Sequence, residues 1–194
     1  SNSFFKYCVV LLNRFKNQKK IKAISGYNFM NDFKKKYSYS FTKHVEVWGW
    51  ATWRDVWKEY DVKMSSWKIK GNKILNQRFP QNIKLKNEYK YKFDLTHKNK
   101  IDTWDHQFVY QVWRSNGLII TPKINLVYNS GFNNKATHTK KKNIFLQKKA
   151  NQLKFPLSHP KKVQEDKNLS TLMDNYYCKK NKLNLEYFFK KINF

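Results

Sequence analysis

Cysteine and long apolar runs are scarce in this sequence, and each shortage excludes a class of protein. Only two cysteines occur in 194 residues, Cys8 and Cys178. They are too few for a disulfide framework and match no metal-ligand spacing, which indicates a reducing, cytoplasmic location. The longest apolar run, YCVVLLNRF, falls short of the roughly 20 residues that span a bilayer and is soon interrupted by Arg14 and Lys16. No small-residue cleavage site follows it, so we do not expect a signal peptide.

Acidic residues are also few: 13 Asp and Glu stand against 40 Lys and Arg, which gives a formal net charge of +27. Such a charge is typical of proteins that bind a polyanion, such as nucleic acid, the acidic face of a membrane or a phosphorylated substrate. It is also typical of a biased composition, because Lys and Asn are frequent throughout. A nucleic-acid reader favours Arg, which is rare here, so nucleic acid is the less favoured partner.

The remaining composition, with 40% hydrophobic and 18% aromatic residues, predicts a folded protein. Its predicted helices and strands make the expected class α/β. Apolar residues at helical spacing predict a first helix over residues 4–15, capped by Ser3. The sequence IKAIS then predicts a short strand over 21–25. Residues 27–46 have the polar, basic character of a loop, and residues 61–100 give no confident assignment beyond short helices.

The second half of the sequence predicts another helix, more strands and a basic tail. DTWDHQFVYQVWRSNG predicts a helix capped by Asp102 or Thr103 and closed at Asn116–Gly117. LIITPKINLVYNSG predicts one or two short strands broken at Pro122, and LNLEYFFKKI predicts a final amphipathic helix.

The order of several motifs resembles that of a known family. These motifs are SFFKYCVVLLNRF with ISGYNF, VWGWATWRDVW with YD, DTWDHQF, NGLIITPKINLVYNSGF, ATHT and PLSHP. Together they resemble the bacterial nucleotide-diphospho-sugar transferases of GT-A fold that are often labelled haemolysin-like (HlpA-like). The likeness runs from residue 3 to about residue 160, and the WGWATW string is its most specific part.

The resemblance implies which part of such an enzyme the chain represents. In the family an acidic metal-binding motif precedes the SFF helix, and a nucleotide-binding half precedes that motif. We therefore expect residues 1–145 to be the acceptor-side part of a GT-A glycosyltransferase domain, without its nucleotide-binding half, and residues 146–194 to be a basic C-terminal extension. Such a half-domain would expose an apolar edge, so we also expect self-association.

The resemblance implies a base in the DTWDHQF helix. Transfer of a sugar from a nucleotide diphosphate to a hydroxyl acceptor, with inversion, needs a carboxylate to take the proton of the attacking hydroxyl. By resemblance Asp105 fills this place, and Asp102 is the second candidate. Both aspartates also suit a purely structural role, because carboxylates are favourable at the positive end of a helix dipole, Asp102 as the cap and Asp105 at the third helical position.

The WGWATW string has the composition of a sugar-binding platform. Tryptophan faces stack on the apolar face of a pyranose, and glycine lets the backbone approach closely. Trp48, Gly49 and Trp50 are the candidates for acceptor contact, with ordinary packing as the alternative. We expect Trp53 and Trp57 in the core.

The resemblance also implies a divalent metal, Mn²⁺ or Mg²⁺, bridging the donor diphosphate. His138 in ATHT is the candidate metal ligand and Lys140 a candidate for binding the diphosphate, with a solvated basic loop as the alternative. The rival functions are a non-catalytic remnant and a basic nucleic-acid or polyanion-binding module. Peripheral contact with the inner, anionic face of a membrane is compatible with each of them.

Overall fold

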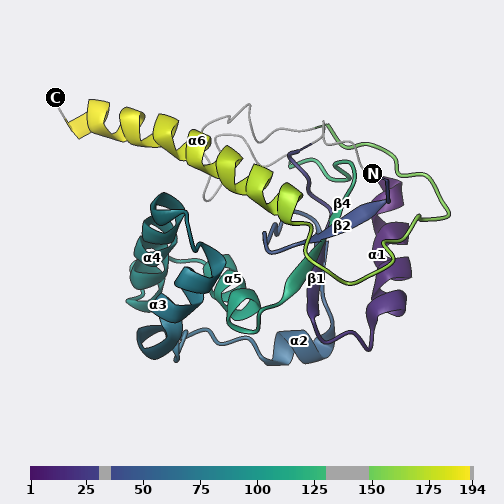
Figure 1. Cartoon of the computed structure of the whole chain (residues 1–194), viewed down its shortest axis with the longest axis horizontal. Coiled ribbons are helices and arrows are strands. Elements are labelled where there is room, and N and C mark those ends of the chain that lie inside the picture. Colours follow the sequence, from purple (N-terminus) through teal and green to yellow (C-terminus); the bar gives the residue numbers. More distant parts are fainter. Residues whose placement is uncertain (31–35, 130–148, 193–194) are drawn as a thin grey trace. The chain divides into compact units, whose positions relative to one another are not determined.

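The computed structural model describes residues 1–30, 36–129 and 149–192, which contain six α-helices and a four-stranded mixed sheet (Figure 1). The predicted α/β class is therefore confirmed. The chain divides into two compact units: unit 1 comprises Ser1–Lys58 and Gly117–Asp166, and unit 2 comprises Glu59–Asn116 and Lys167–Phe194. The predicted boundary at residue 145 does not coincide with this division.

The sheet belongs to unit 1 and has the strand order β2-β4-β1-β3. Its strands are β1 (Ile21–Ser25), β2 (Tyr39–Thr42), β3 (Trp50–Ala51) and β4 (Leu118–Pro122). The central strands β1 and β4 run parallel, whereas β2 and β3 pair antiparallel to β4 and β1 respectively. Every residue of β1 and β4 is buried, which fits the apolar start of β4, whereas β1 also buries Lys22 and Ser25. Strand β1 confirms the predicted strand, and β2 lies in a region predicted as loop.

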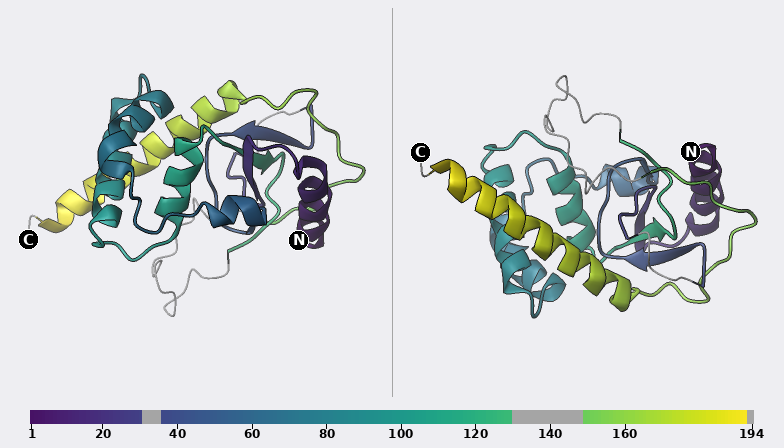
Figure 2. Two further views of the ribbon diagram at one scale, coloured as in Figure 1. Left: turned by 90° about the horizontal axis from the view of Figure 1, so that it is seen from below. Right: turned by 90° about the horizontal axis from the view of Figure 1, so that it is seen from above.

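Helix α1 (Asn2–Phe15) packs against β1, as all the views show (Figures 1 and 2). Tyr7 and Leu11 are fully buried on its inner face, which follows from their spacing of four residues. The predicted cap was wrong, because the helix begins two residues earlier, after Ser1. Ser3 is buried inside the helix, and its hydroxyl accepts a hydrogen bond from the backbone N–H of Leu153 (3.0 Å).

Residues 149–166 pack as part of unit 1. The backbone N–H of Ser158 donates to the Ser38 hydroxyl (2.9 Å), and the N–H of Ser38 donates to the Ser158 carbonyl (2.8 Å). Further along, the N–H of Asp166 donates to the carbonyl of Phe41 in β2 (2.8 Å). The segment therefore follows the β2 edge of the sheet.

The short helix α2 (Arg54–Lys58) follows β3 in unit 1. Trp53, just before it, is half-buried and its indole N–H donates to the carbonyl of Leu12 (3.1 Å), so it packs on the core as predicted. Trp57 is 42% exposed, which corrects the expectation that it lies in the core. Because α2 is too short to turn both residues inward, Val56 takes the buried position instead.

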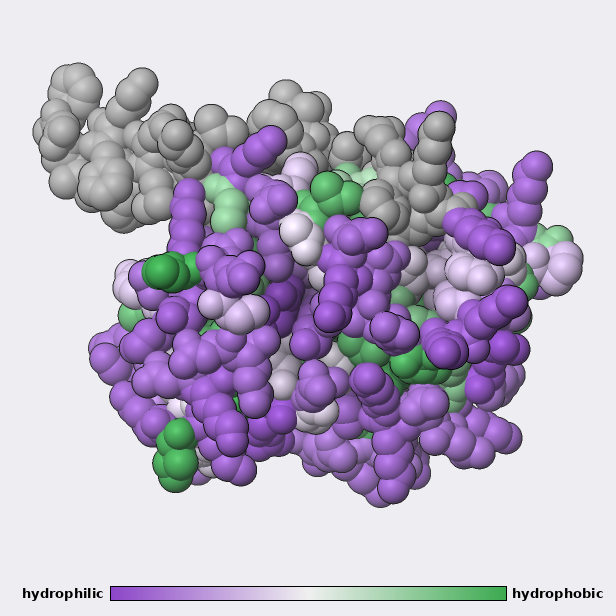
Figure 3. Space-filling view, in the orientation of Figure 1, coloured by the Kyte–Doolittle hydropathy of each residue, from purple (hydrophilic) through white to green (hydrophobic). Residues whose placement is uncertain are grey.

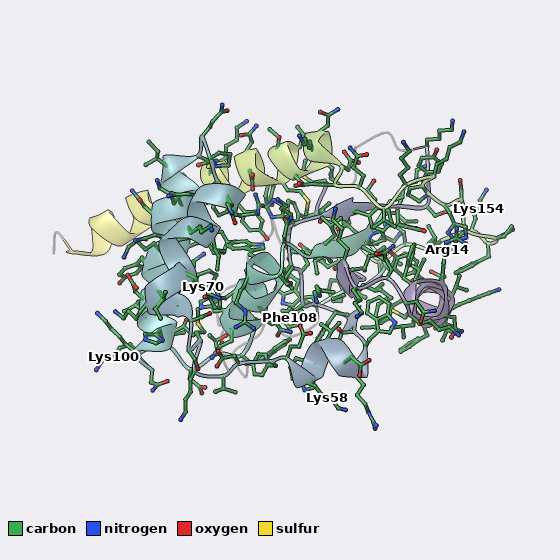
Figure 4. The ribbon with its side chains drawn as sticks, turned by 60° about the horizontal axis from the view of Figure 1, so that its bottom comes forward. Arg14, Lys58, Lys70, Lys100, Phe108 and Lys154 are labelled. Atoms are coloured by element: carbon green, nitrogen blue, oxygen red, sulfur yellow. The ribbon has the colours of Figure 1, made fainter. Side chains whose placement is uncertain are left out.

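Unit 2 is helical and contains α3 (Trp67–Arg78), α4 (Ile83–His97), α5 (Asp105–Arg114) and α6 (Lys167–Ile192). Helices α3, α4 and α5 pack on one another (Figure 2). A cluster of aromatic rings lies between them. Phe108, on α5, is fully buried (Figure 4). Helix α6 begins well before the predicted final helix over residues 183–192. The members of the aromatic cluster are Trp67, Phe79, Tyr89, Phe93, Tyr110 and Trp113.

The surface follows the composition of the chain. Hydrophilic residues dominate the face seen in Figure 3, and hydrophobic residues occupy smaller patches on it. In the described part of the chain, no helix has both the length and the hydropathy needed to cross a membrane. Cys8 and Cys178 are both free thiols, and burial raises the pKa of Cys8 to about 12.

Candidate functional site

The candidate residues fall into three groups. Asp102 and Asp105 belong to unit 2, whereas the Trp48–Gly49–Trp50 turn belongs to unit 1. His138 and Lys140 lie outside the described residues. Each described group is therefore considered within its own unit.

Asp105 is the first residue of α5, and Trp104 is the N-cap. The predicted capping roles of Asp102 and Thr103 and the predicted third helical position of Asp105 are therefore wrong. The physical reason lies in Thr103, whose hydroxyl donates a hydrogen bond to the Asp105 carboxylate and does not accept one from the helix backbone. The half-buried Asp105 carboxylate still benefits from the positive end of the helix.

The surroundings of Asp105 include the phenol of Tyr60. The Tyr60 hydroxyl donates to the carbonyl of Trp104, next to Asp105 (2.9 Å). Burial raises the pKa of Tyr60, and the negative charge of Asp105 raises it further. Tyr60 therefore stays protonated at neutral pH and serves as a neutral hydrogen-bond donor beside the carboxylate.

His106 follows Asp105 and has a defined tautomer. The Thr96 hydroxyl donates to the carbonyl of Lys92 (2.8 Å), so it can only accept from the His106 ring nitrogen Nδ1, which lies 2.8 Å away. His106 therefore carries its proton on Nδ1 and leaves Nε2 as a lone-pair acceptor. Burial lowers the pKa of His106; Asp105 opposes this shift and Lys92 reinforces it. The ring is thus neutral at neutral pH.

Asp102 is less constrained than Asp105. Its side chain is exposed, and it has no hydrogen bond or ion pair with any residue that the structure describes. A free carboxylate in water has its ordinary solvation and no fixed direction. Of the two candidates, Asp105 is the one that the chain holds in a defined position.

The Trp48–Gly49–Trp50 turn requires glycine at its centre. Gly49 has φ +57°, in the left-handed region, and a Cβ placed there would lie 2.5 Å from Cγ1 of Val127. Its carbonyl accepts a hydrogen bond from the N–H of Gly26 (2.7 Å), which fixes the turn beside the end of β1. From the sequence, we expect glycine here to let the backbone approach another group closely. In the structure that group is the side chain of Val127.

The two indole rings of the turn are half-buried and differ in their neighbours. Trp48 meets the ring of buried Tyr27 edge-on, with centroids 4.9 Å apart. Trp50 begins β3 and lies against Trp57, at 5.7 Å between centroids. Partly exposed, supported aromatic rings of this kind are suited to stacking on an apolar sugar face.

The described residues do not by themselves supply a metal site. Nowhere among them do three His, Cys, Asp or Glu side chains come together at coordinating positions. The expected Mn²⁺ or Mg²⁺ would need several such donors, mostly oxygen. No step of the reaction considered below is therefore assigned to a metal.

Tyr60 and Thr96 were missed by sequence reasoning. They lie 45 and 9 positions before Asp105 in a sequence that gives no signal of their proximity. No candidate motif of the sequence assigns Tyr60 a role, and Thr96 falls in the region 61–100 without an assignment. Only the folding of α4 and α5 onto each other brings Thr96 to His106.

Comparisons with known proteins identify no relative of this chain. No protein-family model matches the chain, and neither a curated protein nor a solved structure is significantly similar to it. Function is therefore inferred from the residues of the chain and from the resemblance of its motifs.

Proposed function

We propose that this chain is the acceptor-side part of a glycosyltransferase that moves a sugar from a nucleotide diphosphate to a hydroxyl acceptor. The observation that supports this proposal most is the placement of Asp105, a half-buried carboxylate at the first residue of α5 that is held by the Thr103 hydroxyl. The motif order described above supplies the reaction class.

In the proposed reaction Asp105 is the base. Its carboxylate takes the proton of the acceptor hydroxyl as that oxygen attacks the anomeric carbon. The new carbon–oxygen bond forms as the bond to the nucleotide diphosphate breaks, and the diphosphate leaves with that electron pair, so the anomeric configuration is inverted. The Thr103 hydrogen bond occupies Oδ1 and leaves Oδ2 for the acceptor.

The proposed acceptor platform is the Trp48–Gly49–Trp50 turn in unit 1. Tyr27 supports the Trp48 ring and Trp57 lies against the Trp50 ring, so each indole keeps a defined orientation. Stacking of a sugar ring on such a face contributes binding energy without taking part in the chemistry. Replacing Trp48 by Leu should therefore raise KM for the acceptor and leave kcat nearly unchanged.

The base assignment is tested in the full-length natural protein with Asp105→Asn. Release of nucleotide diphosphate would be measured with a panel of nucleotide sugars and hydroxyl acceptors. We expect kcat to fall about 10² to 10⁴-fold, the usual contribution of a general base. Glu88→Gln, which replaces a half-buried acid of α4 that pairs with Lys92 in the same unit, is the control and should leave kcat unchanged. An unchanged kcat in Asp105→Asn would assign the base elsewhere, and Asp102→Asn then tests the second candidate.

A second candidate function is binding to a polyanion without catalysis. It is favoured by the net charge of +27. Sheet proteins that bind single-stranded nucleic acid expose aromatic and basic residues on one face, whereas β1 and β4 are buried throughout here. A steep fall of RNA or DNA affinity with salt, together with no nucleotide release from any donor, would favour this function over sugar transfer.

A further inference from the structure

The outer face of α1 carries apolar side chains that the sheet does not cover. Phe5 is 71% exposed and Val9 is 58% exposed, and Leu12 on the same side is half-buried. Residues four and seven positions apart lie on one face of a helix, so these three form a continuous stripe along α1. We call Phe5, Val9 and Leu12 the α1 ridge. The sugar-transfer proposal uses none of them.

The α1 ridge is distinct from the apolar residues that α1 contributes to the core. Phe4 points inward, because a Cβ placed on Gly26 would lie 2.6 Å from its ring. The ring of Phe5 meets that of Phe4 edge-on, with centroids 5.4 Å apart, so the inward ring supports the outward one. The fold therefore holds Phe5 in an exposed position where it adds little to the buried core.

The charged residues close to the α1 ridge are all basic. Lys6 lies three residues before Val9, and Lys16, whose backbone is still helical, lies four residues after Leu12. Both lysines are exposed, and neither forms an ion pair with a residue that the structure describes. None of residues 1–31 is acidic. The ridge is thus an apolar stripe within a stretch of chain that carries positive charge only.

A second segment of unit 1 adds to this basic surface. The backbone N–H of Leu153 donates to the Ser3 hydroxyl (3.0 Å), which holds the segment beside the first turns of α1. The Lys6 ammonium lies over the ring of Phe155, 4.6 Å from its centroid. Lys154 comes between these two contacts, is exposed, and lies at the periphery of unit 1 in Figure 4. Cations from two segments therefore accompany the ridge.

The combination of charge and shape decides which partner fits the α1 ridge. A second copy of this chain would place the same cations against one another. Nucleic acid would engage the cations and leave Phe5 and Val9 in water. The exposed side of a helix is convex, so an acidic protein would need a matching groove, whereas a fluid bilayer closes around it. An anionic bilayer satisfies both features, because apolar side chains enter the acyl region while lysines stay with the headgroups.

We propose that the α1 ridge docks unit 1 on an anionic lipid bilayer, with the axis of α1 in the plane of the membrane surface. Phe5 and Val9 enter the boundary between headgroups and acyl chains. Lys6, Lys16 and Lys154 contact the headgroup phosphates. This surface does not depend on the sugar-transfer proposal, and either one can fail without the other.

Binding is tested by sedimenting the full chain with phosphatidylcholine vesicles that contain or lack phosphatidylglycerol. We expect the wild type to bind the anionic vesicles, and less tightly as the salt concentration rises. The double variant Phe5→Gln, Val9→Gln should bind at least about tenfold more weakly, because two apolar side chains lose their burial in lipid. A wild type that does not bind anionic vesicles would overturn the proposal.

Ile69→Gln is the matched control for the apolar part. Ile69 is 86% exposed on α3 and lies between two lysines in sequence, but no apolar residue stands three or four positions from it. It therefore has the same charge environment without a stripe, and its replacement should leave vesicle binding unchanged. Equal weakening in this variant and in Phe5→Gln, Val9→Gln would show that the α1 ridge has no special role, and would contradict the proposal.

The basic part is tested with Lys6→Gln and Lys154→Gln. Each should weaken binding to the anionic vesicles about fivefold at low salt, since a lysine near an anionic surface contributes about that factor. Lys70→Gln on α3 (Figure 4) is the control, because it lowers the net charge by the same amount at an exposed position of unit 2. A loss in Lys70→Gln as large as in the other two variants would assign binding to net charge alone and remove α1 from it.

Insertion is tested with a polarity-sensitive fluorophore on Val9→Cys, in a Cys178→Ser background. Cys8 is buried, and its raised pKa of about 12 further protects it from labelling. We expect a blue shift of the emission on anionic vesicles, and no shift for the same label on Ile69→Cys. A blue shift without vesicles that grows with protein concentration would assign the ridge to a second copy. A shift with polyglutamate but not with vesicles would assign it to an acidic protein, and either result would overturn the proposal.

Discussion

The two units bury their aromatic residues in different ways. In unit 1 the core lies against a sheet whose strands satisfy one another's backbone groups, and aliphatic residues of β1 and β4 fill much of it. In unit 2 the core centres on Phe93, whose ring meets four aromatic neighbours with centroids 5.3 to 5.9 Å apart. These neighbours are Trp67, Tyr89, Tyr110 and Trp113. Unit 2 is thus held by side chains, and unit 1 by strands and side chains together.

The difference shows how a chain with few acids uses them. In unit 2 the indole N–H of Trp67 donates to Asp94 (2.8 Å), and the Tyr110 hydroxyl pairs with Ser66 (2.7 Å). In unit 1 the fully buried Tyr7 hydroxyl has no hydrogen-bond partner among the described residues, and burial raises its pKa well above the ordinary value. The Tyr7 hydroxyl thus differs from the polar groups of Trp67 and Tyr110, which both have partners.

The largest effect is expected from removing the centre of the unit 2 core. Phe93→Ala deletes a fully buried ring, which should lower the free energy of unfolding by about 3 to 5 kcal/mol. Hydrogen exchange of the α4 and α5 amides would measure the loss, with the β1 and β4 amides as the reference. Phe41→Ala is the reciprocal variant in unit 1, where Phe41 is 2% exposed. If each variant lowers protection equally in both units, the two cores unfold together and the comparison fails.

A smaller effect is expected from the ion pair that joins α3 to α6 within unit 2. Both terminal nitrogens of Arg78 donate to the Asp174 carboxylate, at 3.2 and 3.0 Å, and the Arg78 side chain is only 4% exposed. Arg78→Met leaves Asp174 without this partner and should cost about 2 to 3 kcal/mol in urea unfolding.

The control is the exposed pair of Lys90 with Asp94 on α4. Lys90→Met should cost no more than about 0.5 kcal/mol, because a surface pair one helical turn apart contributes little. The double variant Arg78→Met, Asp174→Leu should recover part of the loss, since it removes the unpaired charge. A double variant as unstable as Arg78→Met would mean that Arg78 acts mainly by packing over Phe79 and Trp113.

The Trp48–Gly49–Trp50 turn of unit 1 allows a test of how much the backbone conformation of Gly49 contributes to stability. Gly49→Ala should cost about 1 to 2 kcal/mol from the positive φ alone, plus the cost of displacing Val127. Adding Val127→Ala relieves the contact but not the backbone strain, so the double variant isolates the conformational part. Thermal unfolding followed by far-ultraviolet circular dichroism would measure both. A double variant as stable as Val127→Ala would show that the positive φ is not required.

The sequence correctly predicted the helices and strands whose own residues show a regular pattern of apolar positions. Residues 4–15 have apolar residues at helical spacing and form α1, and IKAIS forms β1 because both faces of that strand are buried. Helices α3 and α4 gave no such signal, since lysines interrupt their apolar residues on every side. Their position depends on Trp67 and Phe93 meeting α5, a contact between segments far apart in sequence. Strand β2 was missed for the same reason, because its pairing with β4 spans about 80 residues.

The candidate site likewise contains parts that could be predicted from the sequence and parts that could not. The WGW turn and the helix that carries Asp105 could be found from residue types and spacing alone. The exact start of α5 could not, because it depends on Thr103 turning its hydroxyl toward Asp105. The roles of Thr96 and Tyr60 could not be predicted either, because their contacts with His106 and Trp104 follow from tertiary packing. Local pattern thus singled out the candidate residues, and tertiary contacts decided their surroundings.

The smallest effect is the pH dependence of stability that His106 contributes to unit 2. Its pKa in the folded chain lies below the ordinary value of 6.5, so the unfolded chain binds more protons as the pH falls through that value. The contribution is therefore present above about pH 6.5 and is lost on acidification, until the folded pKa is reached. Its slope cannot exceed about 1.4 kcal/mol per pH unit. His106→Asn should flatten this slope for the α5 amides and leave that of the β1 amides unchanged, because His159 supplies a separate lowered pKa in unit 1. Hydrogen exchange measured from above about pH 6.5 to the folded pKa would test this prediction. An equal change of the slope in both units would assign the effect to global unfolding.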